Sequence, residues 1–136
     1  KTTFADSRIL ILGWGRIGKC LSQLLKANGC NVTVAARNIA DRAILNALGY
    51  NTLDYSDIPA APSTYDILFN TVPQQRIDSG ILNLWKGCIK LDLASVPGIA
   101  CDNVIYARGL PGKYAPKSSG KLIAESVQSA LKEVSL

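Results

Sequence analysis

The stretch RILILGWGRIG, residues 8–18, decides the fold of this chain. Its first five residues, Arg8–Leu12, form a short run that is apolar after the arginine and ends in glycine, which is typical of a strand buried on both faces of a sheet. The rest fits the pattern GxGxxG: Gly13 permits a sharp bend, Gly15 lets the backbone approach a pyrophosphate, and Gly18 lets the next helix pack closely. Amides at the positive end of that helix bind the anion. The stretch therefore predicts a central strand, a tight turn and a helix that together hold a dinucleotide.

Strands and helices are predicted to alternate along the rest of the chain. Further strands are expected at residues 32–36, 51–53, 65–70, 88–93 and 103–107, and helices at 17–28, 39–48, 77–84 and 121–134, with a glycine, proline and serine loop at 109–119. This alternation predicts the α/β class, a doubly wound parallel sheet forming a Rossmann-type dinucleotide-binding domain, with ligands at the carboxyl ends of the strands.

Length and composition fit one domain over residues 1–136. The chain is 48% hydrophobic and 18% charged, as soluble globular proteins are. No apolar run approaches the roughly 20 residues that cross a bilayer, and the first residues lack the layout of a secretory signal. We expect no membrane association and a cytoplasmic location.

The charge and the cysteines exclude two further kinds of site. The net charge is +5, but the basic residues are spread out, so no nucleic-acid partner is predicted, and the positive field suits an anionic dinucleotide. Cys20, Cys30, Cys88 and Cys101 form no CxxC pair, and the chain has no histidine, so no metal site is predicted. We interpret the cysteines, Cys20 and Cys30 above all, as small apolar residues of the core.

The end of the second predicted strand indicates the cofactor. NAD-selective domains usually present a carboxylate there to the ribose hydroxyl, whereas this chain has Arg37 followed by Asn38. A guanidinium suits the 2′-phosphate of NADP, and Asn38 is predicted to add a hydrogen bond. If Arg37 is instead a solvated residue at a strand end, NAD serves as well. NADP is therefore favoured, and NAD is left open.

Three later segments end predicted strands and should reach the same edge of the sheet. They are Asn70-Thr71-Val72-Pro73, the run from Asp92 to Gly98, and the run from Gly109 to Pro116. In the last of these loops and just beyond it, Lys113, Tyr114 and Lys117 are predicted to bind the carboxylates of a substrate, with Ser95 and Ser118 as hydrogen-bond donors. The alternative is a solvated loop stiffened by proline.

With the glycine turn, these segments make the chain similar to the nicotinamide-nucleotide domain of the family formed by the A subunits of dipicolinate synthase. The resemblance runs from about Ile9 to the last helix and rests on the stretches GWGRIGK, AAR, FNTVP, LDLASVPG and LPGKYAPKSSGK. One departure is that the family pattern tends to place PGG shortly before an aspartate, whereas Ile99-Ala100-Cys101 precede Asp102 here.

The resemblance implies a pyridine-nucleotide oxidoreductase that oxidises dihydrodipicolinate, a dicarboxylate, to the dipicolinate of bacterial spores, with a flavoprotein-like second subunit. It also implies that residues 70–73 lie along the nicotinamide-side ribose, that residues 92–97 border the nicotinamide ring, and that a substrate domain is missing from this chain. The predicted cofactor-binding residues are Gly13, Gly15, Arg16, Ile17, Gly18, Arg37, Asn38, Asn70, Thr71, Val72, Pro73, Asp92, Ala94 and Ser95.

No catalytic residue can be assigned, because hydride transfer depends on the cofactor and the chain has no histidine to move a proton. Two alternatives stay open. One is the cofactor domain of another dehydrogenase, of the 2-hydroxyacid dehydrogenase or adenosylhomocysteine hydrolase type. The other is a non-catalytic nucleotide-sensing module, although such sensors usually carry an acidic residue where Arg37 stands. A homo-oligomer is also left open.

Overall fold

The computed structural model describes residues 4–58, 64–109, 113 and 116–134. The chain divides into two units, of which Lys1–Tyr106 contains the whole sheet and Ala107–Leu136 contains the last helix.

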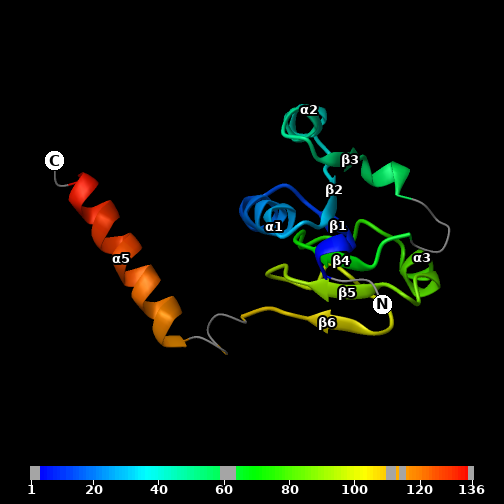
Figure 1. Ribbon diagram of the computed structural model, residues 1–136. Helices are drawn as coiled ribbons and strands as arrows, with labels where there is room; N and C mark the ends of the chain where they lie inside the picture. Colours follow the sequence, from blue (N-terminus) through cyan, green and yellow to red (C-terminus); the bar gives the residue numbers. More distant parts are fainter. Residues whose placement is uncertain (1–3, 59–63, 110–112, 114–115, 135–136) are drawn as a thin grey trace. The chain divides into compact units, whose positions relative to one another are not determined.

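A six-stranded parallel sheet forms the first unit, with the strand order β3-β2-β1-β4-β5-β6 (Figure 1). Its strands are β1 (Arg8–Leu12), β2 (Asn31–Ala35), β3 (Asn51–Leu53), β4 (Ile67–Asn70), β5 (Ile89–Asp92) and β6 (Val104–Tyr106). The chain reverses its direction of winding between β1 and β4, which pair in the middle of the sheet. The prediction of a doubly wound Rossmann-type sheet with a central first strand is confirmed, and ligands of such sheets bind where the order reverses.

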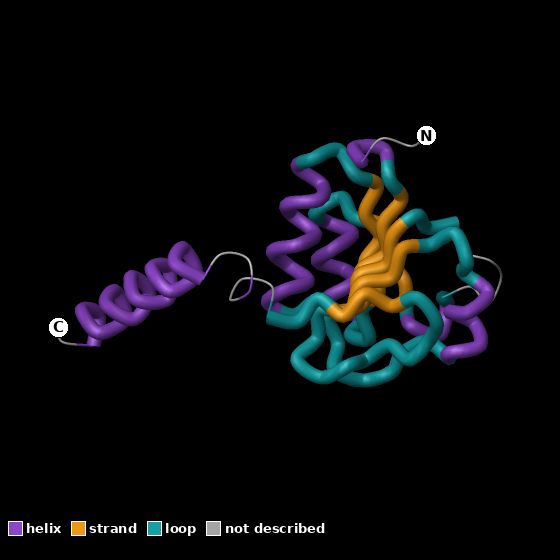
Figure 2. Tube along the Cα trace, turned by 90° about the horizontal axis from the view of Figure 1, so that it is seen from below, coloured by secondary structure: helices purple, strands orange, loops and turns teal. Residues whose placement is uncertain are grey.

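Helices of the first unit cover both faces of the sheet, as Figure 2 shows. This unit contains α1 (Arg16–Ala27), α2 (Ile39–Ala47), α3 (Ser79–Leu84) and two short 3₁₀ turns, η1 (Phe4–Asp6) and η2 (Tyr55–Asp57). The second unit contains α5 (Pro116–Val134). Helices α1 and α2 lie on one face of the sheet and α3 on the other (Figures 1 and 2).

The continuous apolar run of β1 is explained by the two cores that it separates. Ile9 and Ile11 belong to the core shared with α1 and α2. Leu10 and Leu12 point the other way and pack in the core that contains Trp85, which is 1% exposed. Alternate side chains of one strand therefore fill opposite layers, and no position of β1 after Arg8 is left for a polar residue.

Most element boundaries differ from the sequence prediction by one or two residues, and two differences have a clear physical cause. The strand expected from residue 65 begins at Ile67, because the Asp66 carboxylate instead receives hydrogen bonds from the backbone and side chain of Arg8. The last helix begins at Pro116, inside the predicted loop, since proline suits the first helical position, where no amide hydrogen bond is needed. Lys117 and Ser118 are therefore helical residues, and their predicted place in a loop is wrong.

The prediction for the cysteines is wrong for Cys20. Cys30 and Cys88 are buried and Cys101 is half-buried, but Cys20 is exposed. The buried positions of α1 are Gly18, Ser22 and Leu25, so Cys20 falls on the outer face of the helix. Of the described helices, none is both long and apolar enough to cross a membrane.

Candidate dinucleotide-binding site

Two glycines of the turn after β1, Gly13 and Gly18, stand where a side chain would clash with neighbouring atoms. Gly13 has a φ of 103°, and a Cβ there would lie 2.5 Å from Thr71 Oγ1 and 2.7 Å from Val72 Cγ2. A Cβ on Gly18 would overlap the carbonyl oxygen of Gly13. The bend at Gly13 thus folds back on the first turn of α1, and the two glycines depend on each other.

Gly15 differs from its neighbours, because a Cβ there would meet nothing within 4 Å. It is the N-cap residue of α1, and no side chain caps the helix. By contrast, Asn38 caps α2 and Asp78 caps α3 with a side-chain oxygen. The first amides of a helix have no intrahelical acceptor. The positive end of α1 therefore faces open space, with Arg16 adding a further positive charge.

A cavity of about 320 Å³ lies against this helix end. It is lined by Gly15, Arg16, Ile17, Thr71 and Ser95. The lining comes from three segments, those after β1, β4 and β5, which the sequence predicted to share one edge of the sheet. The Thr71 hydroxyl donates a 2.7 Å hydrogen bond to the Leu12 carbonyl, which ties the end of β4 to the end of β1.

Behind this cavity, two buried polar side chains join the ends of β4 and β5. Asn70 Nδ2 donates to Asp92 Oδ1 at 3.0 Å, and the two residues are 0% and 2% exposed. Asp92 also accepts from the amides of Ala94, Gly98 and Ile99 at 3.0, 2.7 and 2.9 Å. The three amide contacts all lie in the loop after β5, so the Asp92 carboxylate stabilises the loop that carries Ser95.

Asn70 and Gly98 complete this arrangement. Asn70 Nδ2 also donates to the Val72 carbonyl at 2.8 Å, and the Val72 amide donates to Asn70 Oδ1 at 3.2 Å. A Cβ on Gly98 would overlap the Val72 carbonyl and lie 2.5 Å from Asn70 Nδ2. The loop after β5 can therefore approach β4 only with glycine at position 98, whereas Pro73 is exposed.

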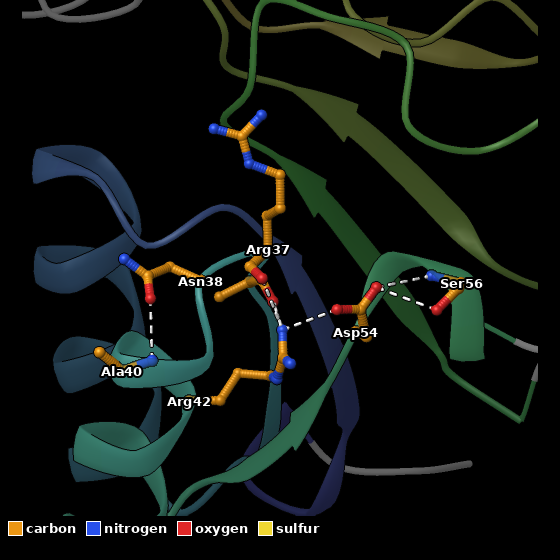
Figure 3. Close-up of polar contacts among 7 residues, drawn as sticks. Arg37, Asn38, Ala40, Arg42, Asp54 and Ser56 are labelled. Atoms are coloured by element: carbon orange, nitrogen blue, oxygen red, sulfur yellow. Dashed lines mark hydrogen bonds and ion pairs between the residues drawn. The ribbon is translucent and has the colours of Figure 1, made fainter.

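Arg37 follows β2 and points away from its polar neighbours (Figure 3). The adjacent Arg42 holds the local structure together: its NH1 atom donates to the carbonyls of Ala36 and Arg37 at 2.6 and 2.8 Å and lies 2.8 Å from Asp54 Oδ2. Asp54 Oδ1 in turn accepts from the amide and hydroxyl of Ser56, and these bonds are the main cause of its lowered pKa. Asp54 is thus already paired, and the Arg37 guanidinium forms no ion pair with any of the described residues.

Asn38 is engaged as well. Its Oδ1 accepts a 2.8 Å hydrogen bond from the Ala40 amide as the cap of α2 (Figure 3). The carboxamide oxygen is therefore taken, which leaves the Nδ2 group for the predicted bond to a phosphate.

Near Arg37, an aromatic ring and a second guanidinium form a cluster. Arg76 lies over the Tyr55 ring, 5.4 Å from its centroid. Burial raises the pKa of Tyr55, while the positive charges of Arg76 and Arg37 act in the opposite direction. Arg76 Nε is sealed from solvent and has no partner in the described part of the chain, and the guanidinium bonds to Gln74 Oε1. Arg76 therefore stands over the Tyr55 ring, and the charge of Arg37 lies within electrostatic range of the same side chain.

Several site residues were missed by sequence reasoning. Arg42, Tyr55 and Arg76 belong to no recognised motif, and their roles depend on contacts across the sheet. Gly98 was assigned no role, although a glycine after a strand end can mark a close backbone approach.

The predicted substrate-binding residues belong to the second unit, Ala107–Leu136. Lys113, Lys117 and Ser118 are exposed in the second unit, and Tyr114 lies outside the described residues.

Comparison with known proteins places the chain in a family. Residues 1–84 match the family described as "D-isomer specific 2-hydroxyacid dehydrogenase, NAD binding domain". The A subunit of dipicolinate synthase of Bacillus subtilis (strain 168) is 30% identical, over 97% of this chain and 48% of that protein.

Two solved structures of such A subunits agree in fold. The one from Bacillus subtilis gives a TM-score of 0.84 at 29% identity, covering 98% of this chain and 48% of that one. The one from Bacillus halodurans gives a TM-score of 0.81 at 27% identity, covering 96% of this chain and 48% of that one. The chain thus spans about half the length of these relatives. It is similar to the A subunit of dipicolinate synthase, and it belongs to the family of NAD-binding domains of the D-isomer specific 2-hydroxyacid dehydrogenases.

Proposed function

We propose that this chain binds NADP(H) at the start of α1 and is the cofactor-binding half of an oxidoreductase similar to the A subunit of dipicolinate synthase. The observation that carries the proposal is the uncapped N-terminus of α1 opening on a cavity of about 320 Å³. The family match supports a nicotinamide dinucleotide as the ligand.

The pyrophosphate would lie against the amides of the first turn of α1. Space for it exists because Gly15 has no side chain and nothing stands within 4 Å of where one would be. The helix dipole and Arg16 both favour an anion there, and no acidic residue is present in the first turn. Thr71 and Ser95 line the same cavity and would lie along the dinucleotide toward the nicotinamide.

The preference for NADP over NAD rests on charge at the end of β2. The 2′-phosphate of NADP needs cationic donors, and Arg37 extends from this edge without an ion-pair partner among the described residues (Figure 3). The nearest carboxylate on the neighbouring strand end, Asp54, is held 2.8 Å from Arg42. Arg76 adds a second guanidinium close to the same tyrosine. This pairing of Asp54 reduces the repulsion that a phosphate would otherwise meet.

A bound nicotinamide would supply hydride transfer, and the residues of this chain would bind and orient it. By similarity to the A subunit of dipicolinate synthase, the substrate is proposed to be dihydrodipicolinate, a dicarboxylate, and the partner a flavoprotein-like second subunit. Lys113, Tyr114, Lys117 and Ser118 remain proposed substrate contacts. The protein is proposed to work in the cytoplasm, where free thiols such as those of Cys30 and Cys88 stay reduced.

A second candidate, another dehydrogenase of the D-2-hydroxyacid type, is favoured by the family match over residues 1–84. It requires a proton-transfer residue from outside this chain, which contains no histidine. The similarity to the A subunit of dipicolinate synthase extends over 97% of the chain and is therefore the stronger guide.

Isothermal titration calorimetry of the chain with NADPH, NADH and AMP tests the cofactor assignment. The proposal expects one site per chain and binding of NADPH at least about tenfold tighter than NADH, a difference of about 1.4 kcal/mol. Equal binding of AMP and NADPH would instead indicate a sensor of adenine nucleotides. No binding of any dinucleotide would contradict the proposal.

A further inference from the structure

A second polar cavity lies away from the glycine turn, on the face of the sheet that α3 covers. Its volume is about 210 Å³, and it is lined by Asn83, Lys86, Lys90, Asp102 and Asn103. None of these residues lines the cavity at the start of α1. Lys90 precedes Asp92 by two residues on β5, so it is set back from the carboxyl edge by about 7 Å.

Lys90 is the unusual member of this group because it is 3% exposed in the middle of a sheet. Lysines are almost never fully buried unless they are paired. Lys90 has no hydrogen bond and no ion pair with any residue in the described ranges. Among the described residues, Arg76 Nε is the only side-chain nitrogen or oxygen that is both sealed from solvent and without a hydrogen-bond partner. The Lys90 ammonium also has no partner, so it is not sealed, and it reaches solvent through the cavity that it lines.

The cavity holds more positive than negative charge. Two ammonium groups, of Lys86 and Lys90, face one carboxylate, of Asp102, which lies beyond the 4.0 Å ion-pair distance from both. The loop that carries Asp102 is fixed to α3, since the Asp102 amide donates a 2.9 Å hydrogen bond to Asn83 Oδ1. Lys90 and Asp102 also act in opposite directions on the pKa of Cys101, which burial raises, so both charges lie within electrostatic range of that thiol.

The geometry points to a binding site for a small oxyanion, phosphate or carboxylate, held between the ammonium groups of Lys90 and Lys86. The Lys90 ammonium reaches solvent through this cavity and has no ion-pair partner among the described residues, so an oxyanion in the cavity would form short charge-assisted hydrogen bonds with it. The volume of about 210 Å³ suits an anion with a few waters and is below the range of pockets that hold larger ligands. The site is independent of the proposed cofactor site and would stand if that proposal failed.

Titration of the ¹⁵N-labelled chain followed by NMR tests this site residue by residue. Inorganic phosphate and acetate are added in separate arms at constant ionic strength, with chloride as the control anion. We expect saturable shifts of the Asn83, Asp102 and Asn103 amides, and the arm that saturates at lower concentration identifies phosphate or carboxylate as the preferred ligand. Shifts confined to residues 15–17 would mean that the anion binds only at the glycine turn and would overturn the proposal.

Variants of Lys90 separate a binding role from a structural one. Lys90→Met keeps the stem and removes the charge, and should weaken the anion at least about tenfold, whereas Lys90→Arg should retain binding. Lys121→Met, at an exposed lysine of α5, is the matched control. Equal affinity in wild type and Lys90→Met would overturn the proposal. So would a wild-type protein whose amides shift no more with phosphate or acetate than with chloride.

A second readout uses the cysteines. An anion that neutralises Lys90 should raise the pKa of Cys101 and slow its alkylation, while the exposed Cys20 on α1 should react at an unchanged rate. Peptide-level mass spectrometry distinguishes the two thiols. An anion that left the Cys101 rate unchanged would contradict the placement beside Lys90.

Discussion

Asn70 Nδ2 and Asp92 Oδ1 lie 3.0 Å apart in the interior of the protein and join the ends of two neighbouring parallel strands. Both residues stand where β4 and β5 end, in register with each other. The pair fixes the positions of the two loops that follow these strands. Thr71 and Ser95, which line the cavity at the glycine turn, belong to these loops.

Asp92→Asn should destabilise the domain by about 3 kcal/mol, because the new NH₂ group would face backbone amides that now donate to a carboxylate. Urea unfolding followed by circular dichroism measures the change. Asp102→Asn, at an exposed position, should shift stability by no more than about 0.5 kcal/mol. Equal effects of the two variants would show that the buried contacts of Asp92 contribute little.

Gly15→Val should abolish NADPH binding while leaving the free energy of unfolding nearly unchanged. The reason is that a side chain there enters open space, and the extended backbone of Gly15, with φ of −82° and ψ of −165°, accepts any residue. Calorimetry and urea unfolding on the same preparation test both halves of the prediction. Retained affinity would mean that the dinucleotide binds elsewhere.

Gly18→Ala, unlike Gly15→Val, should lower the free energy of unfolding. A Cβ at this position overlaps a backbone carbonyl, so the variant should lose about 1–3 kcal/mol of stability from overpacking. The same urea unfolding measures the loss. If Gly18→Ala were as stable as wild type, the first turn of α1 would pack less closely on Gly13 than the structure indicates.

Arg37→Asp should abolish the preference for NADPH over NADH. The loss of a charge-assisted contact worth about 1.5–3 kcal/mol predicts a fall of at least tenfold in NADPH affinity, with NADH little affected. Calorimetry with both dinucleotides measures the ratio. Arg37→Gln separates the loss of attraction from added repulsion, and Lys86→Asp controls for net charge. Unchanged selectivity in Arg37→Asp would remove Arg37 from the site.

Acid should weaken the fold partly through Asp66. Hydrogen bonds from Arg8 lower the pKa of this carboxylate below its ordinary value of 3.8. The ionised Asp66 carboxylate therefore contributes fully to stability at a pH above its pKa in the unfolded chain. This contribution is lost as the pH falls through its lower pKa in the folded protein. Melting temperatures between about pH 6 and about pH 2 should therefore fall less steeply in Asp66→Asn than in wild type. Parallel curves would show that the exposed Arg8–Asp66 pair adds nothing.

The sequence predicted the elements better than the contacts between them. Hydrophobic periodicity and glycine spacing are local, so β1, the glycine turn and α1 could be located from residues 8–28 alone. The function of Arg42 could not, because its partner Asp54 is brought near by the crossover from β2 to β3. Likewise, Lys90 is buried because it lies on the same face of β5 as Asp92. The predicted strand at 88–93 did not indicate which of its two faces is buried.

If the dinucleotide binds as proposed, the missing cap of α1 would couple cofactor supply to the lifetime of the protein. A ligand that binds only the folded chain at 100 times its dissociation constant stabilises that chain by about 2.7 kcal/mol. Starvation for the dinucleotide would then raise the fraction of molecules open to proteases about a hundredfold. Turnover of the polypeptide would in this way report the state of the nicotinamide pool.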